Sequence, residues 1–397
     1  MEKNNMLWIN FLHIYQPVNT DAYNITEATE KSYLRIVRAL EENREIKFTI
    51  NINGCLFLRW EELGYQDLIR RIGELIKRGQ LEITGNAAYH PLLPLIPLAE
   101  AKKQILESEE IFKKYFGNDF KLKGFFFSEM AYSKEVAALV KSLGYEWTVL
   151  DEISLNGKIG NHDFSKNYVD KNSGLKIIFR SRELSNSFVP GTIGKMIENN
   201  KELAITATDG ELYGLRYIDQ TGKLEKLLKQ RNLKTLTVSE FLKQNIEEKN
   251  TAVVNSSWES TEEELKNNKS YILWQDKDKE IQNSLWDLAN LAYRTIEENK
   301  HDSNYIWARW HLVRGLASCT FWWASGKDFK ESFGPLAWSP DEIERGSNEL
   351  IRAIRALENI ETREVKMKSE KMYIEIKRKI WEQHWTYYWK KNIDKNL

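Results

Sequence analysis

The sequence predicts an α/β fold of parallel strands and helices, followed by an all-helical C-terminal region. Apolar strand-like runs and amphipathic helical runs alternate seven or eight times in residues 1–245. Such alternation implies parallel strands joined by helical crossovers. In residues 246–397 only helical patterns follow. A closed barrel and an open doubly wound sheet both fit the first part, but no GxGxxG and no P-loop supports a nucleotide-binding open sheet.

Each expected strand is a short apolar run closed by polar or turn residues. The expected strands are 6–12, 46–52, 81–84, 123–127, 146–150, 175–179, 203–207 and 234–238. Residues 151–173 are rich in Asn, Gly, Asp and Lys, which predicts a loop. The expected helices of the first part are 27–43, 66–77, 99–115, 133–143 and 222–230, with a further helix capped by Ser239. Ser133 is expected to cap the helix that it begins.

In the second part the helical patterns lie near 276–298, 304–324, 340–359 and 363–391. Thr261 and Glu264 form a capping-box pattern just before them. The last helix carries Trp381, Trp385 and Trp389 at four-residue spacing, which places them on one face. That face predicts either a helix docked on the body of the protein or a partner-binding helix.

Charge and cysteine content restrict the partners and the location. Lys+Arg and Asp+Glu both number 58, so no field of one sign is available to attract nucleic acid. Cys55 and Cys319 are far apart and fit no metal-ligand spacing, which indicates two reduced thiols in a cytoplasmic protein. The N-terminus has no signal-peptide pattern, and no apolar window is long enough to span a bilayer. We therefore expect no membrane partner.

Polar, titratable residues stand where several apolar runs end. Each alone is more often a packing or capping residue than a functional one. In a parallel barrel, however, the carboxyl ends of the strands meet and form the active site. The residues at such ends are His13, His90, Glu129, Arg180 and Asp209. Their gathering at one end of a sheet favours function.

Two of these residues suggest glycoside chemistry. Glu129 and Asp209 are carboxylates at the ends of different strands. A retaining glycosidase needs a nucleophilic carboxylate and a second acid roughly 5–5.5 Å away. Only a fold that gathers strand ends would bring together two residues so distant in sequence.

Five segments, in order along residues 6–215, resemble motifs of glycoside hydrolase family 57, the retaining α-glucan-acting enzymes. They are His13–Pro17, Gly79–Thr84 with Tyr89–Pro94, Gly124–Glu129, Phe179–Ser185 and Thr208–Gly214. The resemblance implies an incomplete (β/α)7 barrel (1–245) with a helical region (246–397) that packs over its mouth. It also implies that Glu129 is the nucleophile and Asp209 the general acid/base, with no metal or cofactor.

The same resemblance suggests the residues that would bind an α-1,4-glucan or maltooligosaccharide. They are His13, Gln16, His90, Arg180, Glu211, Trp258, Trp322 and Trp338. Ordinary packing remains an alternative for the tryptophans, Trp323 included. Phe126 or Phe127 stands where relatives often have Trp. The stretch Ala317–Gly326 is nearest to the family's fifth motif.

Three alternatives to an α-amylase-like hydrolase stay open. The first is a glucanotransferase or branching enzyme built on the same site. The second is a metal-dependent polysaccharide deacetylase with His13, His90 and Asp209 around an ion, although no His-x-x-x-His or paired Asp motif supports it. The third is a catalytically silent glycan-binding homologue. Oligomeric state is not predicted by the sequence.

Overall fold

The computed structural model of the chain describes residues 5–160, 162–244, 247–327 and 336–393. They form two compact units, which are described one at a time. The first unit comprises Met1–Ala88 and Leu93–Leu265, and the second comprises Tyr89–Leu92 and Lys266–Leu397. The boundary that we expected near residue 245 therefore falls inside the first unit. The expected packing of the helical region over the barrel mouth stays a prediction.

The strands all belong to the first unit and form two five-stranded sheets. The strands are β1 (Met6–Ile14), β2 (Phe48–Ile52), β3 (Leu81–Ile83), β4 (Gly124–Phe125), β5 (Trp147–Asp151), β6 (Asn167–Asp170), β7 (Lys176–Arg180), β8 (Leu203–Asp209), β9 (Leu233–Thr235) and β10 (Glu248–Thr251). One sheet has the order β3-β2-β1-β8 with β9 beside β1, and the other has the order β10-β6-β7-β5-β4. Every pair is parallel except β6 with β7.

The two sheets join at both ends and so close a seven-stranded barrel, β1-β2-β3-β4-β5-β7-β8. At one junction Gly85 pairs with Phe125 in parallel, and its amide donates to the Gly124 carbonyl at 2.8 Å. At the other, the Ser181 amide of the β7 end donates to the Ile205 carbonyl of β8 at 3.0 Å. Both junctions are short, which agrees with the incomplete (β/α)7 barrel that was predicted.

The first junction depends on glycine. A Cβ at Gly85 would lie 2.4 Å from the Tyr145 ring, and a Cβ at Gly124 would lie 2.2 Å from the Trp147 ring. Real Cβ atoms do not approach other atoms so closely. Two large aromatic side chains therefore fill the space that the glycines leave, and β3 and β4 can approach each other.

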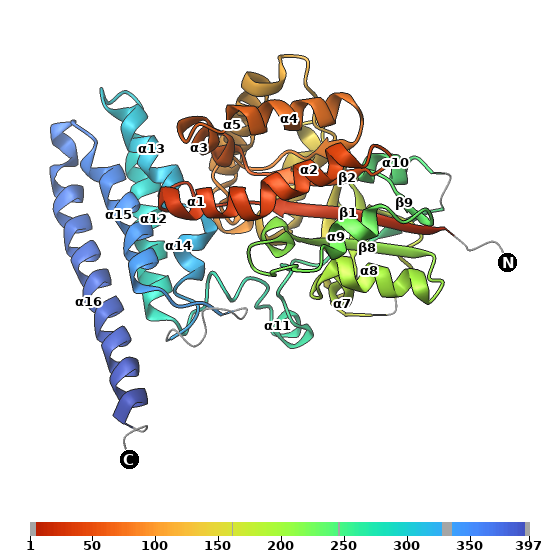
Figure 1. The fold of residues 1–397 in the computed structure, drawn as a ribbon. Coiled ribbons are helices and arrows are strands. Elements are labelled where there is room, and N and C mark those ends of the chain that lie inside the picture. The colour runs from red at the N-terminus through yellow and green to blue at the C-terminus, as the bar shows by residue number, and fades with distance from the viewer. Residues whose placement is uncertain (1–4, 161, 245–246, 328–335, 394–397) are drawn as a thin grey trace. The chain divides into compact units, whose positions relative to one another are not determined.

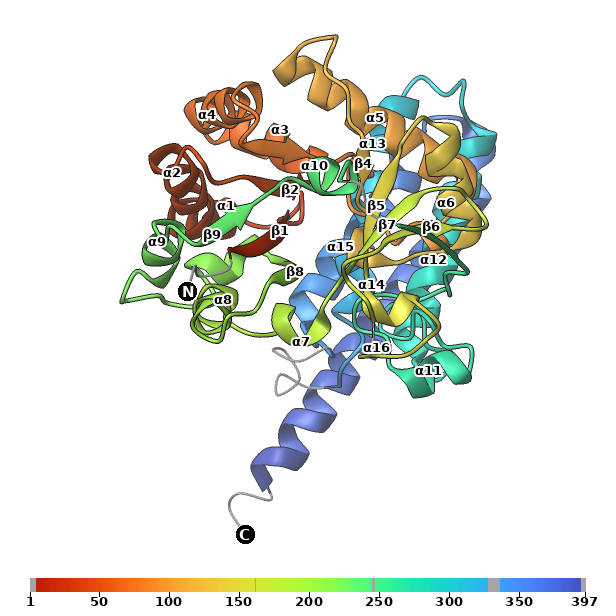
Figure 2. The same cartoon turned by 90° about the vertical axis from the view of Figure 1, so that its right-hand side faces the viewer.

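Helices cover the outside of the strands (Figures 1 and 2). The helices of the first unit are α1 (Ala22–Ala28), α2 (Leu34–Glu42), α3 (Gly54–Glu62), α4 (Gln66–Lys77), α5 (Leu98–Phe116), α6 (Lys134–Ser142), α7 (Arg182–Ser185), α8 (Val189–Glu198), α9 (Lys223–Leu228), α10 (Val238–Leu242) and α11 (Glu262–Lys266). Successive contacts link α8, α9, α2, α4, α3, α5 and α6 around the strands. The buried residues of α4 are Leu68, Ile69, Ile72 and Leu75, which recur at helical spacing on one face.

Short helical turns complete the unit, and several lie at strand ends. They are η1 (Thr29–Tyr33), a π-helical turn between α1 and α2, and the 3₁₀ turns η2 (Leu93–Leu95), η3 (Ser128–Met130), η4 (Glu152–Ser154) and η5 (Gly210–Tyr213). The turns η3, η4 and η5 follow β4, β5 and β8 almost at once. They hold the polar residues that come after these strands close to the strand ends.

Some local expectations are confirmed and others are wrong. Ser133 caps α6 by accepting from the Val136 amide, and Thr261 and Glu264 cap each other reciprocally. Thr237 rather than Ser239 caps α10, because its side chain accepts from the Glu240 amide. The expected loop 151–173 contains β6, and β10 is a strand beyond residue 246, where only helices were expected. β10 was missed because it has no apolar alternation: its side chains are mostly exposed.

The second unit is helical. Its elements are α12 (Glu280–Glu298), α13 (Tyr305–Gly315), α14 (Ser318–Trp322), α15 (Pro340–Arg355), η7 (Ile360–Thr362) and α16 (Arg363–Ile393). The single helix expected over 304–324 breaks at Leu316 and Ala317 into α13 and α14. No helix of the described residues is both long and apolar enough to cross a membrane.

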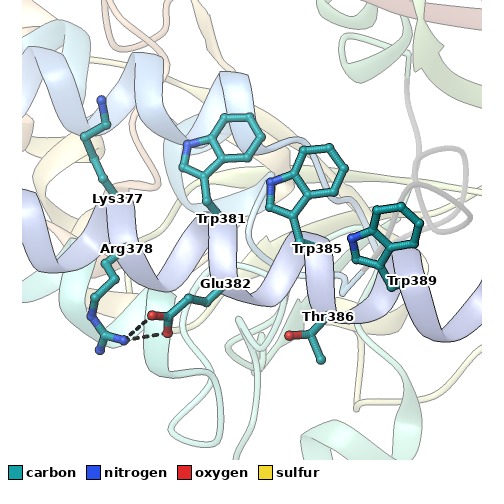
Figure 3. Close-up of a pocket in the computed structure, with 7 residues that line it drawn as sticks. All are labelled: Lys377, Arg378, Trp381, Glu382, Trp385, Thr386 and Trp389. Atoms are coloured by element: carbon teal, nitrogen blue, oxygen red, sulfur yellow. Dashed lines mark hydrogen bonds and ion pairs between the residues drawn. The ribbon is translucent and has the colours of Figure 1, made fainter.

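The tryptophan row of α16 is present as predicted. Figure 3 shows Trp381, Trp385 and Trp389 side by side on one face of the helix, where they line an open groove of about 620 Å³. Trp381 is tied to α15 by its indole N–H, which donates to Glu344 at 2.6 Å. Trp385 and Trp389 are 46% and 58% exposed. The start of the row is thus docked within the unit, while its end faces solvent.

Candidate active site

Three polar residues stand side by side at the carboxyl ends of β2, β1 and β8. His13 is the register partner of Asn51 in β2 and of Asp209 in β8. The Asn51 amide nitrogen donates to Thr84 at 3.0 Å, so its oxygen accepts from His13 Nδ1 at 2.9 Å. Burial lowers the pKa of His13, and the nearby Asp209 only partly offsets this effect. His13 is therefore a neutral imidazole with Nε2 as the acceptor nitrogen.

Asp209 is the carboxylate of this row, and Arg216 binds it. The Arg216 guanidinium donates to Asp209 Oδ2 at 2.7 Å. The Asp209 side chain is 22% exposed and that of Arg216 is 59% exposed. The pair is thus open to solvent on the arginine side, and the arginine comes from the segment that follows η5.

Glu211 lies two residues beyond Asp209 and is buried. Its Oε1 accepts from Gln16 Nε2 at 2.9 Å and from the Tyr33 hydroxyl. Burial, and then the Asp209 carboxylate, raise the pKa of Glu211 to about 7. Burial and Glu211 also raise the pKa of Tyr33 well above its ordinary value, so Tyr33 keeps its proton and remains a donor. The two neighbouring acids therefore have different environments.

Glu129 lies in η3, beyond the end of β4, and its backbone is strained. Its φ and ψ are 60° and 20°, and the next residue, Met130, has a φ of 49°. This left-handed region is uncommon for residues other than glycine and asparagine. Such strain costs on the order of 1–3 kcal/mol per residue and is concentrated at functional sites. The Glu129 side chain is half-buried.

Trp258 connects the Glu129 segment to the other strand ends. Its amide donates to the Glu129 carbonyl at 3.1 Å. Its ring meets the His13 ring edge-on, with the centroids 6.0 Å apart. The Phe126 ring stacks on His13 at 4.7 Å and meets Trp258 at 6.4 Å. One aromatic cluster therefore adjoins both segments: Trp258 bonds to the Glu129 backbone, and His13 is the strand neighbour of Asp209.

Arg180 is buried, and protein groups surround it. Its guanidinium donates to Asp151 at 2.7 Å, to the Ala207 carbonyl at 2.8 Å and to the Trp258 carbonyl at 3.3 Å. Arg182 also donates to Asp151, at 2.7 and 3.0 Å. Through these bonds Arg180 ties β5, β7 and β8 to the Trp258 segment. Its role as a sugar ligand stays a prediction; the bonds described make it a positioning residue for Trp258.

A further carboxyl, Glu259, adjoins Trp258. Burial raises the pKa of Glu259, while Arg180 and Arg182 act in the opposite direction. Asp151 and Asp209 also raise it, which places Glu259 within electrostatic reach of both. Its side chain is half-buried. Glu259 is thus a further acid within electrostatic reach of Asp209 that was not expected from the sequence.

His90, Trp322 and Trp338 belong to the second unit and are described within it. His90 has a left-handed φ of 55°, and its Nδ1 is 2.9 Å from the Ser318 hydroxyl. The Ser318 amide donates to the His90 carbonyl at 2.9 Å, so the second motif meets the Ala317–Gly326 stretch. Trp322 is half-buried against Trp323. Trp338 is fully buried beside His384, which favours packing.

Sequence reasoning missed several residues of this cluster: Asn51, Tyr33, Asp151, Arg216 and Glu259. Asp151 could have been found, because it ends the apolar run of β5. Tyr33 comes from the π-helical turn, and nothing in its local pattern points to Glu211, 178 residues away. Among the described residues, no group of three His, Cys, Asp or Glu side chains is arranged to hold a metal ion.

The model of one protein family, glycosyl hydrolase family 57, matches residues 3–255. The chain belongs to glycosyl hydrolase family 57. The α-amylase of Pyrococcus abyssi is 28% identical over 221 residues, which are 52% of this chain and 33% of that protein. The 4-α-glucanotransferase of Thermococcus litoralis is 26% identical over 257 residues, 59% of this chain and 38% of that protein. The chain thus spans about a third of the length of these relatives.

Solved structures of the family share the fold. The Thermococcus litoralis 4-α-glucanotransferase superposes with a TM-score of 0.72 at 19% identity, over 89% of this chain and 60% of that chain. A family 57 branching enzyme from Thermococcus kodakaraensis gives a TM-score of 0.66 at 14% identity, over 94% and 95% of the two chains. The family and the fold class that the motifs suggested are therefore confirmed.

Proposed function

We propose that the chain is a retaining glycosidase that acts on α-1,4-glucan or maltooligosaccharides through a covalent glycosyl-enzyme intermediate. The observation that carries this proposal is the linked pair of strand ends: Asp209 lies beside His13, and the strained Glu129 is tied through Trp258 to the same ring. The printed names of the family relatives, α-amylase and 4-α-glucanotransferase, support an α-glucan substrate.

In the first half-reaction, a Glu129 oxygen bonds to the anomeric carbon as the glycosidic C–O bond breaks. The proton of the Asp209 carboxyl passes to the departing oxygen, and Asp209 becomes a carboxylate. In the second half-reaction, Asp209 takes a proton from water or a sugar hydroxyl, whose oxygen bonds to the anomeric carbon and releases Glu129. Water gives hydrolysis, and a sugar hydroxyl gives transfer.

The surrounding residues have supporting roles in this proposal. His13, Gln16, Trp258 and Glu211 would contact or orient the sugar held between the two carboxyls. Glu129 and Asp209 are expected about 5–5.5 Å apart, the separation that direct attack requires.

Product analysis tests the proposal. Maltoheptaose and amylose are incubated with the wild type, Glu129→Gln, Asp209→Asn and the control Glu146→Gln, which alters an exposed glutamate of the same unit. We expect the control to retain activity and the two site variants to lose at least about 100-fold. Shorter sugars indicate hydrolysis, longer ones transfer, and new α-1,6 linkages branching. Full activity of Glu129→Gln would refute the assignment.

Azide assigns the two carboxyls separately. With Glu129→Gly, azide should attack from the vacated nucleophile side and give a β-glycosyl azide. With Asp209→Gly, azide should attack the glycosyl-enzyme and give the α-azide. Unchanged glycan binding with no turnover by any variant or by the wild type would instead indicate a silent binding protein.

A further inference from the structure

A tight turn after β10, residues 257–260, brings two side chains to the candidate active site. The Ser260 amide donates to the Ser257 carbonyl at 3.2 Å, and the Ser257 amide donates back to the Ser260 hydroxyl at 2.8 Å. Trp258 and Glu259 are the two central residues of this β-turn and form its tip.

Three contacts hold the turn in place. The Trp258 amide donates to the Glu129 carbonyl at 3.1 Å. Arg180 donates to the Trp258 carbonyl at 3.3 Å, and Arg182 donates to the Ser260 carbonyl at 2.8 Å. The turn therefore has a fixed position beside the Glu129 segment.

The carboxyl of Glu259 is half-buried at the tip of this turn. Of the residues that the structure describes, none donates a hydrogen bond to this carboxyl or forms an ion pair with it. The two nearby arginines are already occupied, because Arg180 and Arg182 each bond to Asp151 at 2.7 Å. Burial is the largest cause that raises the pKa of Glu259. The carboxyl thus gives up part of its hydration without a protein donor in return.

Charges of both signs lie around the Glu259 carboxyl. Arg180 and Arg182 lower its pKa, while Asp151 and Asp209 raise it. This mixed setting does not favour a cationic ligand, because the two arginines repel cations. A sugar hydroxyl is a neutral donor and suits it better. A carboxylate only accepts hydrogen bonds, and its two oxygens can accept from two neighbouring hydroxyls.

We propose that Glu259 is a substrate-binding residue, whose carboxylate accepts hydrogen bonds from the hydroxyls of a glucan sugar unit beside Trp258. This inference rests on the proposed function. Trp258 bonds to the Glu129 segment, and Asp209 lies within electrostatic reach of Glu259, so a sugar that meets both proposed catalytic carboxyls comes close to the tip of the turn. The Trp258 ring offers apolar contact and Glu259 offers acceptor oxygens, a combination typical of ligand sites.

Glu259→Ala should affect stability and binding in opposite directions. Because the pKa of Glu259 is raised in the folded protein, its ionised form is disfavoured there, and the charge costs stability at neutral pH. At pH 7 the melting temperature of Glu259→Ala should therefore equal or exceed that of the wild type. A melting temperature several degrees lower would indicate a structural role and would overturn the proposal.

Binding is measured without turnover, by calorimetry of maltotetraose with Glu129→Gln as the reference protein. Glu259→Ala, Glu259→Gln or the control Glu146→Ala is then added to the reference; Glu146 is an exposed glutamate just before the amino end of β5. We expect Glu259→Ala to raise the Kd about 10- to 100-fold, and Glu259→Gln to raise it less because the amide keeps one acceptor oxygen. The control should leave the Kd unchanged.

Deoxygenated sugars separate a direct contact from an indirect effect. Maltotetraose analogues that each lack one hydroxyl are compared on the reference and on the reference with Glu259→Ala. Loss of the hydroxyl that Glu259 binds should weaken binding to the reference but not to the protein with Glu259→Ala. If every hydroxyl gave the same loss on both proteins, Glu259 would act indirectly, and that result would overturn the proposal.

A wild type that turns over glucans, together with an unchanged maltotetraose Kd for Glu259→Ala, would overturn this inference alone. If the wild type binds maltotetraose but converts no glucan, the proposed function fails, and the deoxygenated series still decides what Glu259 does. If the wild type neither binds nor converts maltotetraose, the proposed function and this inference fail together.

Discussion

Replacing Glu211 with glutamine should remove a pH dependence of stability that originates in the active-site cluster. Glu211 is 3% exposed, and Gln16 and Tyr33 donate to its Oε1. Burial and Asp209 raise its pKa from 4.5 to about 7. In the unfolded chain the carboxyl ionises at its ordinary pKa, whereas in the folded protein it keeps its proton until about pH 7.

The sign and size of the effect follow from linkage. Below about pH 4.5 the group is protonated in both states and has no effect on stability. Between pH 4.5 and 7 only the unfolded state loses the proton, so the free energy of unfolding falls as pH rises. The shift corresponds to a loss of about 3 kcal/mol across that window, after which the loss is constant. Glutamine does not titrate, so Glu211→Gln should lack this loss.

The assay is urea unfolding of the wild type, Glu211→Gln and the exposed-site control Glu146→Gln at half-unit steps from pH 4 to 8. The free energy of unfolding of Glu211→Gln, relative to that of the wild type, should rise by about 3 kcal/mol between pH 4.5 and 7. The difference for the control should stay flat. A flat difference for Glu211→Gln as well would show that Glu211 titrates normally and would refute the reasoning.

Three further changes have definite expectations. Glu129→Gly relieves the left-handed strain, so the free energy of unfolding should stay equal or rise by up to about 1 kcal/mol while glucan turnover is lost; a large loss of stability would contradict a functional origin of the strain. Asp151→Ala leaves Arg180 and Arg182 without their shared carboxylate and should cost about 3–5 kcal/mol in urea unfolding, against little change for Arg231→Met at an exposed arginine of the same unit. Gly214→Ala puts a methyl group against the Lys31 carbonyl and should lower the melting temperature by several degrees. Gly194→Ala, whose Cβ would meet nothing within 4 Å apart from its chain neighbours and the backbone of its own helix, should not.

The residues at the strand ends could be predicted from the sequence because the pattern that marks them is local. Each of His13, Arg180 and Asp209 ends or nearly ends an apolar run, and a parallel barrel brings such ends to one side. The order of the motifs along the chain also indicated the family. Neither the apolar runs nor the order of the motifs depends on knowing which side chains touch. The fold class and the residues at the strand ends could therefore be predicted.

Contacts made by residues in turns and helix interiors could not be predicted from the sequence. Tyr33 lies in a π-helical turn, Arg216 in the irregular segment after η5 and Glu259 after β10, and each reaches the cluster through the closed barrel. The left-handed backbone of Glu129 has no sequence signature either, because a glutamate between Ser128 and Met130 fits an ordinary turn. Such features arise when the chain closes on itself, and composition and periodicity do not encode them.

The two neighbouring acids of the cluster, Glu211 and Asp209, lie in different electrostatic environments. Glu211 is buried with two neutral donors and holds its proton to about pH 7, whereas Asp209 is bonded to a guanidinium at the solvent side. Like charges so close favour one shared proton over two ionised carboxyls. That proton resides on Glu211, whose pKa burial and Asp209 raise to about 7. Glu211 therefore keeps a proton beside Asp209 below about pH 7, while Arg216 is bonded to Asp209.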